Sequence, residues 1–461
     1  MNLEQTHKFD EAQRLAQKYV RSNPDDPQGH LLLGRALMHR GYWDDARRAF
    51  DTAYTLDRDN LDIPLHIANT WRFEARKPLT MPNADPETIR ASCEGMRKAL
   101  AVLNELTPAD PDRLGLLSVK GHTHYDLAKI CMLLYARLEE QADLIADVKP
   151  GEARALRDEA QQVRTDGEEA FARARDNLRT AILEDPSRGH DAQALVLICE
   201  RLKDDDTLAE IRPRIMGLEA PPPLAAMHLV RIGLDDARGK SESAYRKALP
   251  EACATLDELI AGQTTRNERI ELRIMRGRLA LDNRNPQEAL AQAEKVLALQ
   301  EDHPAGQLVK ALALFRQDKI EQAENDLFAL QTRRPNDVEV LFHYGRVAKA
   351  AGKLPLARTA FKKIIENHPD HPLTPLAYGH RAELDMAEGL RDEAFDNAMR
   401  HYSQRPDDPY ALLALVRASM GTRNEAIVLN ILPKAVQHAE GDLAMLNAAA
   451  KSFEVLGKRD T

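Results

Sequence analysis

The sequence is poor in aromatic residues, in glycine and in cysteine. Aromatic residues make up 5% of the 461 positions, 22 positions are glycine, and only four are cysteine. Runs of β-branched residues are rare, whereas Ala, Leu, Arg, Asp and Glu are abundant, and most of these favour helices. The composition therefore favours an all-helical protein. With 43% hydrophobic and 30% charged residues, the chain has the balance of a folded, soluble protein.

Long apolar segments are missing as well. No apolar run approaches the ~20 residues that a membrane-spanning helix needs, and the N-terminal MNLEQTHKFDEAQRL has no apolar signal-peptide core. The net charge is −9 and no Lys/Arg block dominates any segment, so nucleic-acid binding is not indicated. We expect a cytoplasmic protein, although the chain begins inside a repeat, so an upstream signal or anchor could have been lost.

The cysteines and histidines do not predict a metal site. Cys93, Cys131, Cys199 and Cys253 are far apart and contain no CxxC, which excludes a zinc site of the usual spacing. In GHTHYD, His122 and Asp126 lie four residues apart and thus on one helical face. A third ligand cannot be identified, so we expect ordinary polar residues, free buried thiols, and no metal or cofactor.

Signatures of catalysis are also missing. There is no glycine-rich phosphate loop of standard spacing, and no serine stands in a nucleophile-elbow setting. Without a strand-rich segment there is no room for a Rossmann-type domain. We therefore expect that the chain is not an enzyme.

Small residues recur every 34 positions in the C-terminal half. The recurring residues are Ala289, Ala323 and Ala357; Gly277, Ala311, Gly345 and Gly379; and Pro335 and Pro369. A fixed period of this size predicts a solenoid of antiparallel helix pairs. In the unit 338–371, Gly345 and Ala357 would let the two helices approach closely, and Phe361 would fill the gap one turn later. Gly352 would end the first helix, as C-terminal glycines commonly do.

This pattern resembles the tetratricopeptide repeat (TPR) family. Its signature has a small residue at the eighth position, Ala at the twentieth, an aromatic at the twenty-fourth and Pro near the end. The units 27–60 and 338–371 match well, 270–303 and 304–337 match moderately, and 372–406 matches with about three extra residues before Ala394. Residues 7–60 and 264–438, roughly half the chain, carry the resemblance. It implies an all-α, right-handed superhelical solenoid.

The middle of the chain departs from the repeat. Residues 112–147 and 151–185 predict two helices much longer than the family norm, and so a long helical hairpin insertion. The proline run in EAPPPLA (219–225) is the best candidate for a boundary. We expect an N-terminal TPR-like segment over 1–219, with the hairpin at about 112–185. A C-terminal TPR array would span 220–461, with its best repeats at 270–406 and a terminal capping helix.

The resemblance implies a protein–protein interaction scaffold or adaptor, whose concave groove binds a partner peptide or helix. The alternative is a substrate-recognition or assembly subunit of an enzyme, or of an envelope or secretion complex, with the catalytic part on another chain. A chaperone-tail clamp would need Lys at the fifth and Asn at the ninth position. Leu31 and Arg35, and Ile274 and Arg278, stand there instead, so that ligand is not predicted.

The same positions predict the groove. In the C-terminal repeats, the fifth positions are Ile274, Leu308, Phe342 and Leu376, and the ninth positions are Arg278, Leu312, Arg346 and His380. Phe315 stands at a twelfth position, and Arg35 stands at the ninth position of the first repeat. We expect an apolar strip beside a basic one, and a partner peptide with apolar anchors and acidic residues. The alternative left open is that these arginines pair with acids such as Glu339 and Asp282 and bind nothing.

Overall fold

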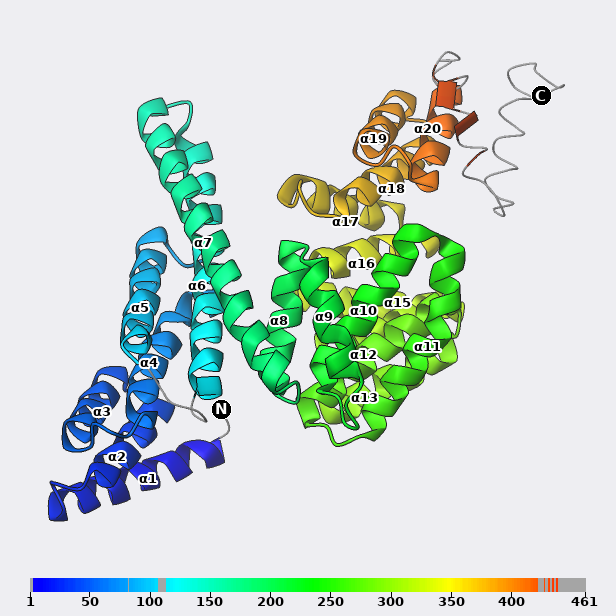
Figure 1. Ribbon diagram of the computed structural model, residues 1–461. Helices are drawn as coiled ribbons and strands as arrows, with labels where there is room; N and C mark the ends of the chain where they lie inside the picture. Colours follow the sequence, from blue (N-terminus) through cyan, green and yellow to red (C-terminus); the bar gives the residue numbers. More distant parts are fainter. Residues whose placement is uncertain are drawn as a thin grey trace. The chain divides into compact units, whose positions relative to one another are not determined.

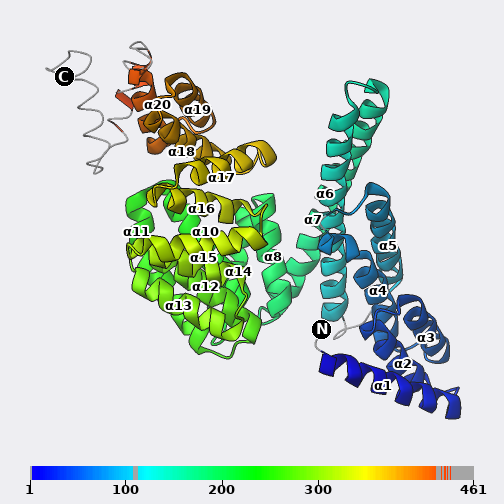
Figure 2. The same ribbon diagram turned by 180° about the vertical axis from the view of Figure 1, so that it is seen from behind.

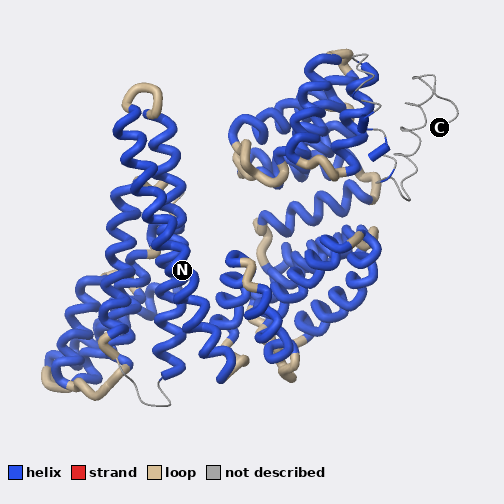
Figure 3. Tube along the Cα trace, turned by 45° about the horizontal axis from the view of Figure 1, so that its top comes forward, coloured by secondary structure: helices blue, strands red, loops and turns tan. Residues whose placement is uncertain are grey.

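The computed structural model describes residues 3–81, 83–106 and 113–421, together with residues 427, 430, 431, 433, 434 and 437. These residues form helices joined by short connections and contain no strand, which confirms the all-α prediction (Figure 3). None of the described helices is long and apolar enough to cross a membrane. By packing, the chain divides into two compact units, Met1–Ala248 and Leu249–Thr461, and helix α11 (Glu242–Ala261) crosses the division.

The first unit is a row of helices in which each packs on the next. They are α1 (Leu3–Ser22), α2 (Pro27–His39), α3 (Trp43–Leu56), α4 (Asp62–Ala75), the 3₁₀ helix η1 (Lys77–Thr80), α5 (Pro86–Asn104), α6 (Arg113–Ile145), α7 (Pro150–Glu184), α8 (Gly189–Leu202), α9 (Asp205–Met216) and α10 (Pro223–Lys240). The first helices of successive pairs also pack on one another, α2 on α4, α4 on α6 and α6 on α8. We call these first helices A helices and their partners B helices.

The predicted long hairpin is confirmed as α6 and α7, of 33 and 35 residues. The two helices run antiparallel along each other and extend past α4 and α5 (Figures 1 and 2). α5 packs along the hairpin, and Arg90 on α5 donates from Nε to Oε1 of Glu159 on α7 (2.7 Å). Nearer the tip, Ala142 and Ala153 are fully buried or nearly so. The hairpin is thus supported by α5 as far as Glu159 and by its own small residues beyond that point.

The second unit repeats the same pairing. Its helices after α11 are α12 (Arg266–Asp282), α13 (Pro286–Leu299), α14 (Pro304–Arg316), α15 (Ile320–Arg333), α16 (Val338–Ala350), α17 (Leu354–Asn367), α18 (Thr374–Ala387), α19 (Arg391–Gln404) and α20 (Pro409–Gly421). The pairs α14/α15, α16/α17 and α18/α19 each lie within one predicted repeat, and α12/α13 does so except for the first four residues of α12. The 34-residue period is therefore a period of helix pairs.

The recurring residues have the packing roles that the sequence predicted. Ala289, Ala323 and Ala357 are fully buried. A Cβ built on Gly345 would lie 2.8 Å from Cζ of Phe361, which is itself fully buried. The glycine is required because the aromatic ring occupies the space that a side chain at this position would need. In the first unit, Gly34 lies against Phe50 in the same way.

The turn after each A helix of the second unit also repeats. Gly352 has a φ of +76° and so adopts the left-handed conformation that favours glycine. The positions 34 and 68 residues earlier, Asp318 and Arg284, have φ values of 62° and 55°. The fold thus keeps the left-handed turn even where a side chain makes it unfavourable.

The repeat 372–406 differs in how its gap is filled. Ala398, not an aromatic residue, stands four residues after Ala394. The space beside Gly379 is taken by His401, whose Nδ1 lies 2.5 Å from the position of a Cβ on that glycine. His401 is fully buried, and its Nε2 lies 3.3 Å from Oδ2 of Asp408.

Two further predictions are not decided. The proline-containing segment 219–225 begins after α9 and ends in the first turn of α10, and α10 packs on both α8 and α9. The domain boundary at 219/220 stays a prediction. The terminal capping helix, predicted over 442–461, lies outside the described residues.

Candidate functional site

In the second unit, the A helices lie side by side. α12 packs on α14 and α14 on α16, although a B helix separates each two in the chain. Lys349 on α16 donates from Nζ to Glu383 on α18, which extends the row. We call the face of these four helices that carries Arg278, Arg346 and His380 the C-terminal A-helix surface.

The apolar residues predicted to line this surface belong largely to the core. Leu308 and Phe342 share one buried cluster, and they are only 3% and 5% exposed. Ile274 is 7% exposed. Phe315 and Leu376 pack against the same cluster as Leu308 and Phe342 but stay partly exposed. Leu312 packs against this cluster in the same way, so Leu312, Phe315 and Leu376 are the predicted apolar residues that keep appreciable surface for a ligand.

Three arginines from three A helices surround one histidine on this surface. Burial, together with the positive charges of Arg346, Arg278 and Arg316, lowers the pKa of His343 to about 3. Burial, together with Arg316, also lowers the pKa of Arg346. Arg346 lies 5.8 Å from the Phe342 ring, and its Nη1 is 3.5 Å from Nδ1 of His343. The region is electropositive although the whole chain is acidic.

The arginines differ in their partners. Arg278 donates from Nη2 to Oε2 of Glu339 on α16 (2.9 Å), as one of the sequence alternatives predicted. In the part of the chain that the structure describes, Arg316 and Arg346 form no ion pair. Sequence analysis missed Arg316, which stands at the last position of α14, and His343, since neither occupies a fifth, ninth or twelfth position.

His380 is part of a hydrogen-bonded group at the α18 end. The hydroxyl oxygen of Tyr410 lies 2.8 Å from Nδ1 of His380, and the His380 ring stacks on Phe361 with centroids 5.0 Å apart. Burial lowers the pKa of His380. Burial alone would raise the pKa of Glu383, but hydrogen bonds from His380 and Lys349 bring it down to about 2. His380 therefore serves to position its neighbours as well as to face the surface.

Arg35, the remaining predicted residue, lies on α2 in the first unit. Its Nε donates to Nε2 of His66 on α4 (2.9 Å). Burial and the charge of Arg35 lower the pKa of His66, which keeps this histidine neutral. Arg35 is thus not brought together with the other predicted residues.

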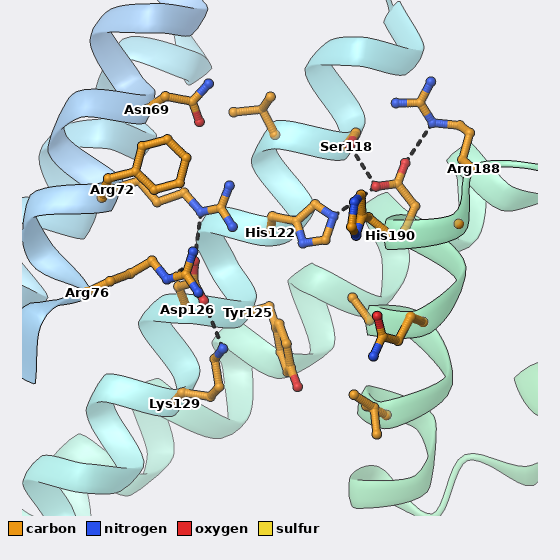
Figure 4. A pocket seen from close by; sticks show the side chains of 17 residues that line it. Asn69, Arg72, Arg76, Ser118, His122, Tyr125, Asp126, Lys129, Arg188 and His190 are labelled. Atoms are coloured by element: carbon orange, nitrogen blue, oxygen red, sulfur yellow. Dashed lines mark hydrogen bonds and ion pairs between the residues drawn. The ribbon is translucent and has the colours of Figure 1, made fainter. Parts of the chain in front are cut away.

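A cavity of about 970 Å³ opens between the A helices α4, α6 and α8 of the first unit (Figure 4). Its lining residues are Asn69, Arg72, Phe73 and Arg76 from α4; Ser118, Val119, His122, Tyr125, Asp126 and Lys129 from α6; and Arg188, Gly189, His190, Asp191, Gln193, Ala194 and Leu197 at α8. Sequence analysis singled out His122 and Asp126 here but did not predict the cavity.

Asp126 is buried on one side of this cavity and binds three cations. Its Oδ2 accepts from Nε of Arg72 (2.7 Å) and lies 3.4 Å from Nε of Arg76, while its Oδ1 lies 2.9 Å from Nζ of Lys129. Burial would raise the pKa of Asp126, but Arg72 and Lys129 hold it below its ordinary value. The carboxylate is therefore ionised and draws the three cations together.

Asp191, on α8, forms a second cluster. Its Oδ1 accepts from Oγ of Ser118 (2.7 Å) and lies 2.8 Å from Nε2 of His122, and its Oδ2 accepts from Nε of Arg188 (2.7 Å). Burial raises its pKa, but the hydrogen bonds from His122, Arg188 and Ser118 outweigh that effect and lower it to about 2.

His122 and Asp126 thus belong to separate polar clusters. No group of three His, Cys, Asp or Glu residues that could hold a metal ion occurs among the residues that the structure describes. The four cysteines are buried free thiols, as predicted, and the sulfurs of Cys93 and Cys131 lie 3.9 Å apart.

Comparison with known proteins gives family matches in both parts of the chain. A tetratricopeptide repeat model matches residues 2–60, and a model described as Psidin, N-terminal TPR repeats region, matches residues 279–426. No curated protein sequence matches the chain.

Solved structures resemble the chain at low identity. A chain from the crystal structure of the APC/C hetero-tetramer Cut9–Hcn1 is 13% identical, with 99% of this chain and 82% of that chain covered and a TM-score of 0.53. Yeast Tom70 is 13% identical, with 99% and 93% covered and a TM-score of 0.42. A tetratricopeptide repeat protein from Parabacteroides merdae is 13% identical, with 69% and 98% covered and a TM-score of 0.38.

The first of these likenesses indicates the same fold, since its TM-score exceeds 0.5. The family matches lie where the 34-residue period, the buried alanines and the left-handed turns are observed. Residues 2–60 and 279–426 therefore match the tetratricopeptide repeat family, and the fold of the chain is a TPR solenoid.

Proposed function

We propose that this protein is an interaction scaffold without catalytic activity of its own, and that the C-terminal A-helix surface binds an acidic segment of a partner protein. The observation that carries this proposal is the convergence of Arg278, Arg316 and Arg346 around His343. The chain has a net charge of −9, so a local excess of positive charge on one face is a specific feature. Such a patch orients an acidic partner and speeds its association.

Apolar contacts would come from few residues. Phe315, Leu312 and Leu376 are partly buried, and their remaining surface is available to a ligand. Ile274, Leu308 and Phe342 lie in the core, where they position the arginines rather than contact a partner. Charge therefore contributes more to recognition than the pattern of fifth and ninth positions alone implies.

The pair between Arg278 and Glu339 does not prevent binding. The two side chains are 47% and 41% exposed, and an exposed pair of this kind contributes only ~0–1 kcal/mol. A carboxylate of the partner can replace Glu339 at little cost. Arg316 and Arg346, which have no ion-pair partner among the described residues, need no such exchange.

The test selects ligands from a random peptide library displayed on phage, with the full chain as bait. We expect enriched peptides that combine Asp or Glu with apolar residues. Their affinity is then measured by fluorescence anisotropy for the wild type and for Arg278→Glu/Arg346→Glu. At low salt the double variant should bind about ten-fold more weakly or worse, because attraction becomes repulsion.

The matched control is Lys295→Glu/Lys362→Glu, which makes the same change of charge on the B helices α13 and α17. This variant should bind the peptides as the wild type does. An equal loss of affinity in both variants would mean that only the net charge of the protein matters, which would contradict the proposal. An unchanged affinity of the arginine variant would overturn it as well.

A further inference from the structure

The cavity between α4, α6 and α8 carries more positive than negative charge. Among its lining residues are four Arg and Lys side chains, Arg72, Arg76, Lys129 and Arg188, and two carboxylates, Asp126 and Asp191. In Figure 4 the α4 arginines reach toward α6, and Arg188 approaches from the start of α8. The cavity belongs wholly to the first unit.

The excess charge gathers at Asp126. Three cations, Arg72, Arg76 and Lys129, surround this single carboxylate, so two positive charges remain uncompensated there. A buried carboxylate needs one well-placed cation to be stable, and further cations repel one another. Asp191, by contrast, pairs directly with Arg188, Ser118 and His122 complete its hydrogen bonds, and the charge of Arg72 acts on it from farther away.

The same side chains keep hydrogen-bond donors unused. Arg72 and Arg76 both approach Asp126 through Nε. Within the described residues, the Nη groups of these two arginines have no hydrogen-bond acceptor. Arg76 is 42% exposed and Lys129 33% exposed, so both can reach a ligand in the cavity. Two guanidinium groups and an ammonium at one point are suited to an anion with several oxygens.

We propose that this cavity binds the dianion of a phosphate monoester. A phosphate monoester places a charge of about −1.5 to −2 on a single centre with three acceptor oxygens, which matches two excess positive charges gathered at one point. A ligand with two carboxylates carries the same charge on two separate groups, and so matches the single cluster of cations less well. The proposal does not rest on the function proposed for the second unit.

The size of the cavity leaves room for the group that carries the phosphate. A volume of about 970 Å³ far exceeds that of one phosphate. Asn69, Ser118 and Gln193 offer polar contacts along the wall, and Phe73, which is 38% exposed, offers an apolar one. The phosphate could come from a phosphorylated side chain of a protein segment or from a small phosphorylated molecule.

The test is isothermal titration of the full chain with inorganic phosphate, a Gly–phosphoserine–Gly tripeptide, adenosine monophosphate and succinate. The wild type should bind the phosphate-bearing probes at a saturable site. Arg76→Gln and Lys129→Gln should each weaken that binding by about ten-fold or more, since each removes a charge-assisted hydrogen bond. Both side chains are at least one-third exposed, and melting curves check that the variants fold.

The matched control is Arg173→Gln, because Arg173 is 63% exposed on α7 and, among the described residues, forms its ion pair with Glu169 at the surface. It should leave phosphate binding unchanged. Tighter binding of the tripeptide than of adenosine monophosphate would assign a protein source, and the reverse a small molecule; both support the site. Absence of phosphate binding, binding that Arg76→Gln and Lys129→Gln leave intact, or equal affinity for succinate would overturn the proposal.

Discussion

Gly345→Ala tests the packing on which each repeat depends. The added methyl group would lie 2.8, 2.9 and 3.1 Å from three carbons of the Phe361 ring, all closer than such atoms normally approach. The ring cannot easily move, because Phe361 is fully buried, stacks on His380 with centroids 5.0 Å apart, and meets the edge of Phe342 at 6.0 Å. Either the helix pair or the ring stack must shift.

Two effects of opposite sign determine how much Gly345→Ala changes the stability of the helix pair. Alanine is favoured over glycine inside a helix by ~1 kcal/mol. Overpacking a well-filled core costs ~1–3 kcal/mol. With three ring atoms in the way, we expect the packing cost to win and the pair α16/α17 to lose about 1–2 kcal/mol of local stability.

Hydrogen exchange measured by mass spectrometry on peptides of α16 and α17 is the suitable assay, because repeat arrays can open locally without unfolding as a whole. Exchange should become about ten-fold faster, which corresponds to ~1.4 kcal/mol. The control is Gly115→Ala in α6, where no atom lies within 4 Å of the new methyl group. That change should be neutral or stabilising.

A double-mutant cycle isolates the contact. In a Phe361→Leu background the side chain is smaller, so Gly345→Ala should cost less than in the wild type. If Gly345→Ala is tolerated as well as Gly115→Ala, or if its cost is the same in the leucine background, then the glycine is not required by the ring, and the packing account of the repeat is wrong.

Three further predictions concern turns, pH and the hairpin. Asp318→Gly should stabilise the second unit by up to ~1 kcal/mol in urea unfolding, because glycine adopts its positive φ without a Cβ penalty. Burial lowers the pKa of His124 to about 4 in the folded chain. As the pH falls, this histidine therefore takes up its proton in the unfolded chain at a higher pH than in the folded chain. The first unit should therefore lose ~3 kcal/mol as the pH falls from about 7 to about 4, and a His124→Gln variant should flatten the decline. Replacing residues 142–154 by a short turn should leave hydrogen exchange in α5 unchanged, since the α5 contact at Glu159 lies outside the replaced segment; faster exchange there would contradict this.

The fold was predictable because its constraints are local and periodic. Gly345, Ala357 and Phe361 lie within one repeat, so their spacing alone encodes the packing of a helix pair. The long hairpin was predictable from two helical segments without a break. The role of His401 was not, because it stands outside the register of the aromatic that it replaces.

The candidate sites were less predictable, because they depend on neighbouring pairs. The partners of Asp126 and Asp191 are separated by as many as 54 and 73 residues in the chain, and the long hairpin interrupts the period between them. On the C-terminal A-helix surface, the fifth positions at Leu308 and Phe342 are covered by the core cluster, which position numbers alone do not reveal. Arg316 was detectable in principle, since it follows Leu312 by one helical turn and so shares its face.

Photo-crosslinking tests the central claim, which is that the A-helix surface of the second unit is the binding surface. p-Benzoylphenylalanine replaces Phe315 on the A helix α14 or, as the control, Phe328 on the B helix α15, where the side chain is 52% exposed. Each protein is irradiated with a peptide enriched from the phage library. The account predicts a crosslink from position 315 that excess unlabelled peptide abolishes, and none from position 328. A crosslink from position 328 alone would contradict it.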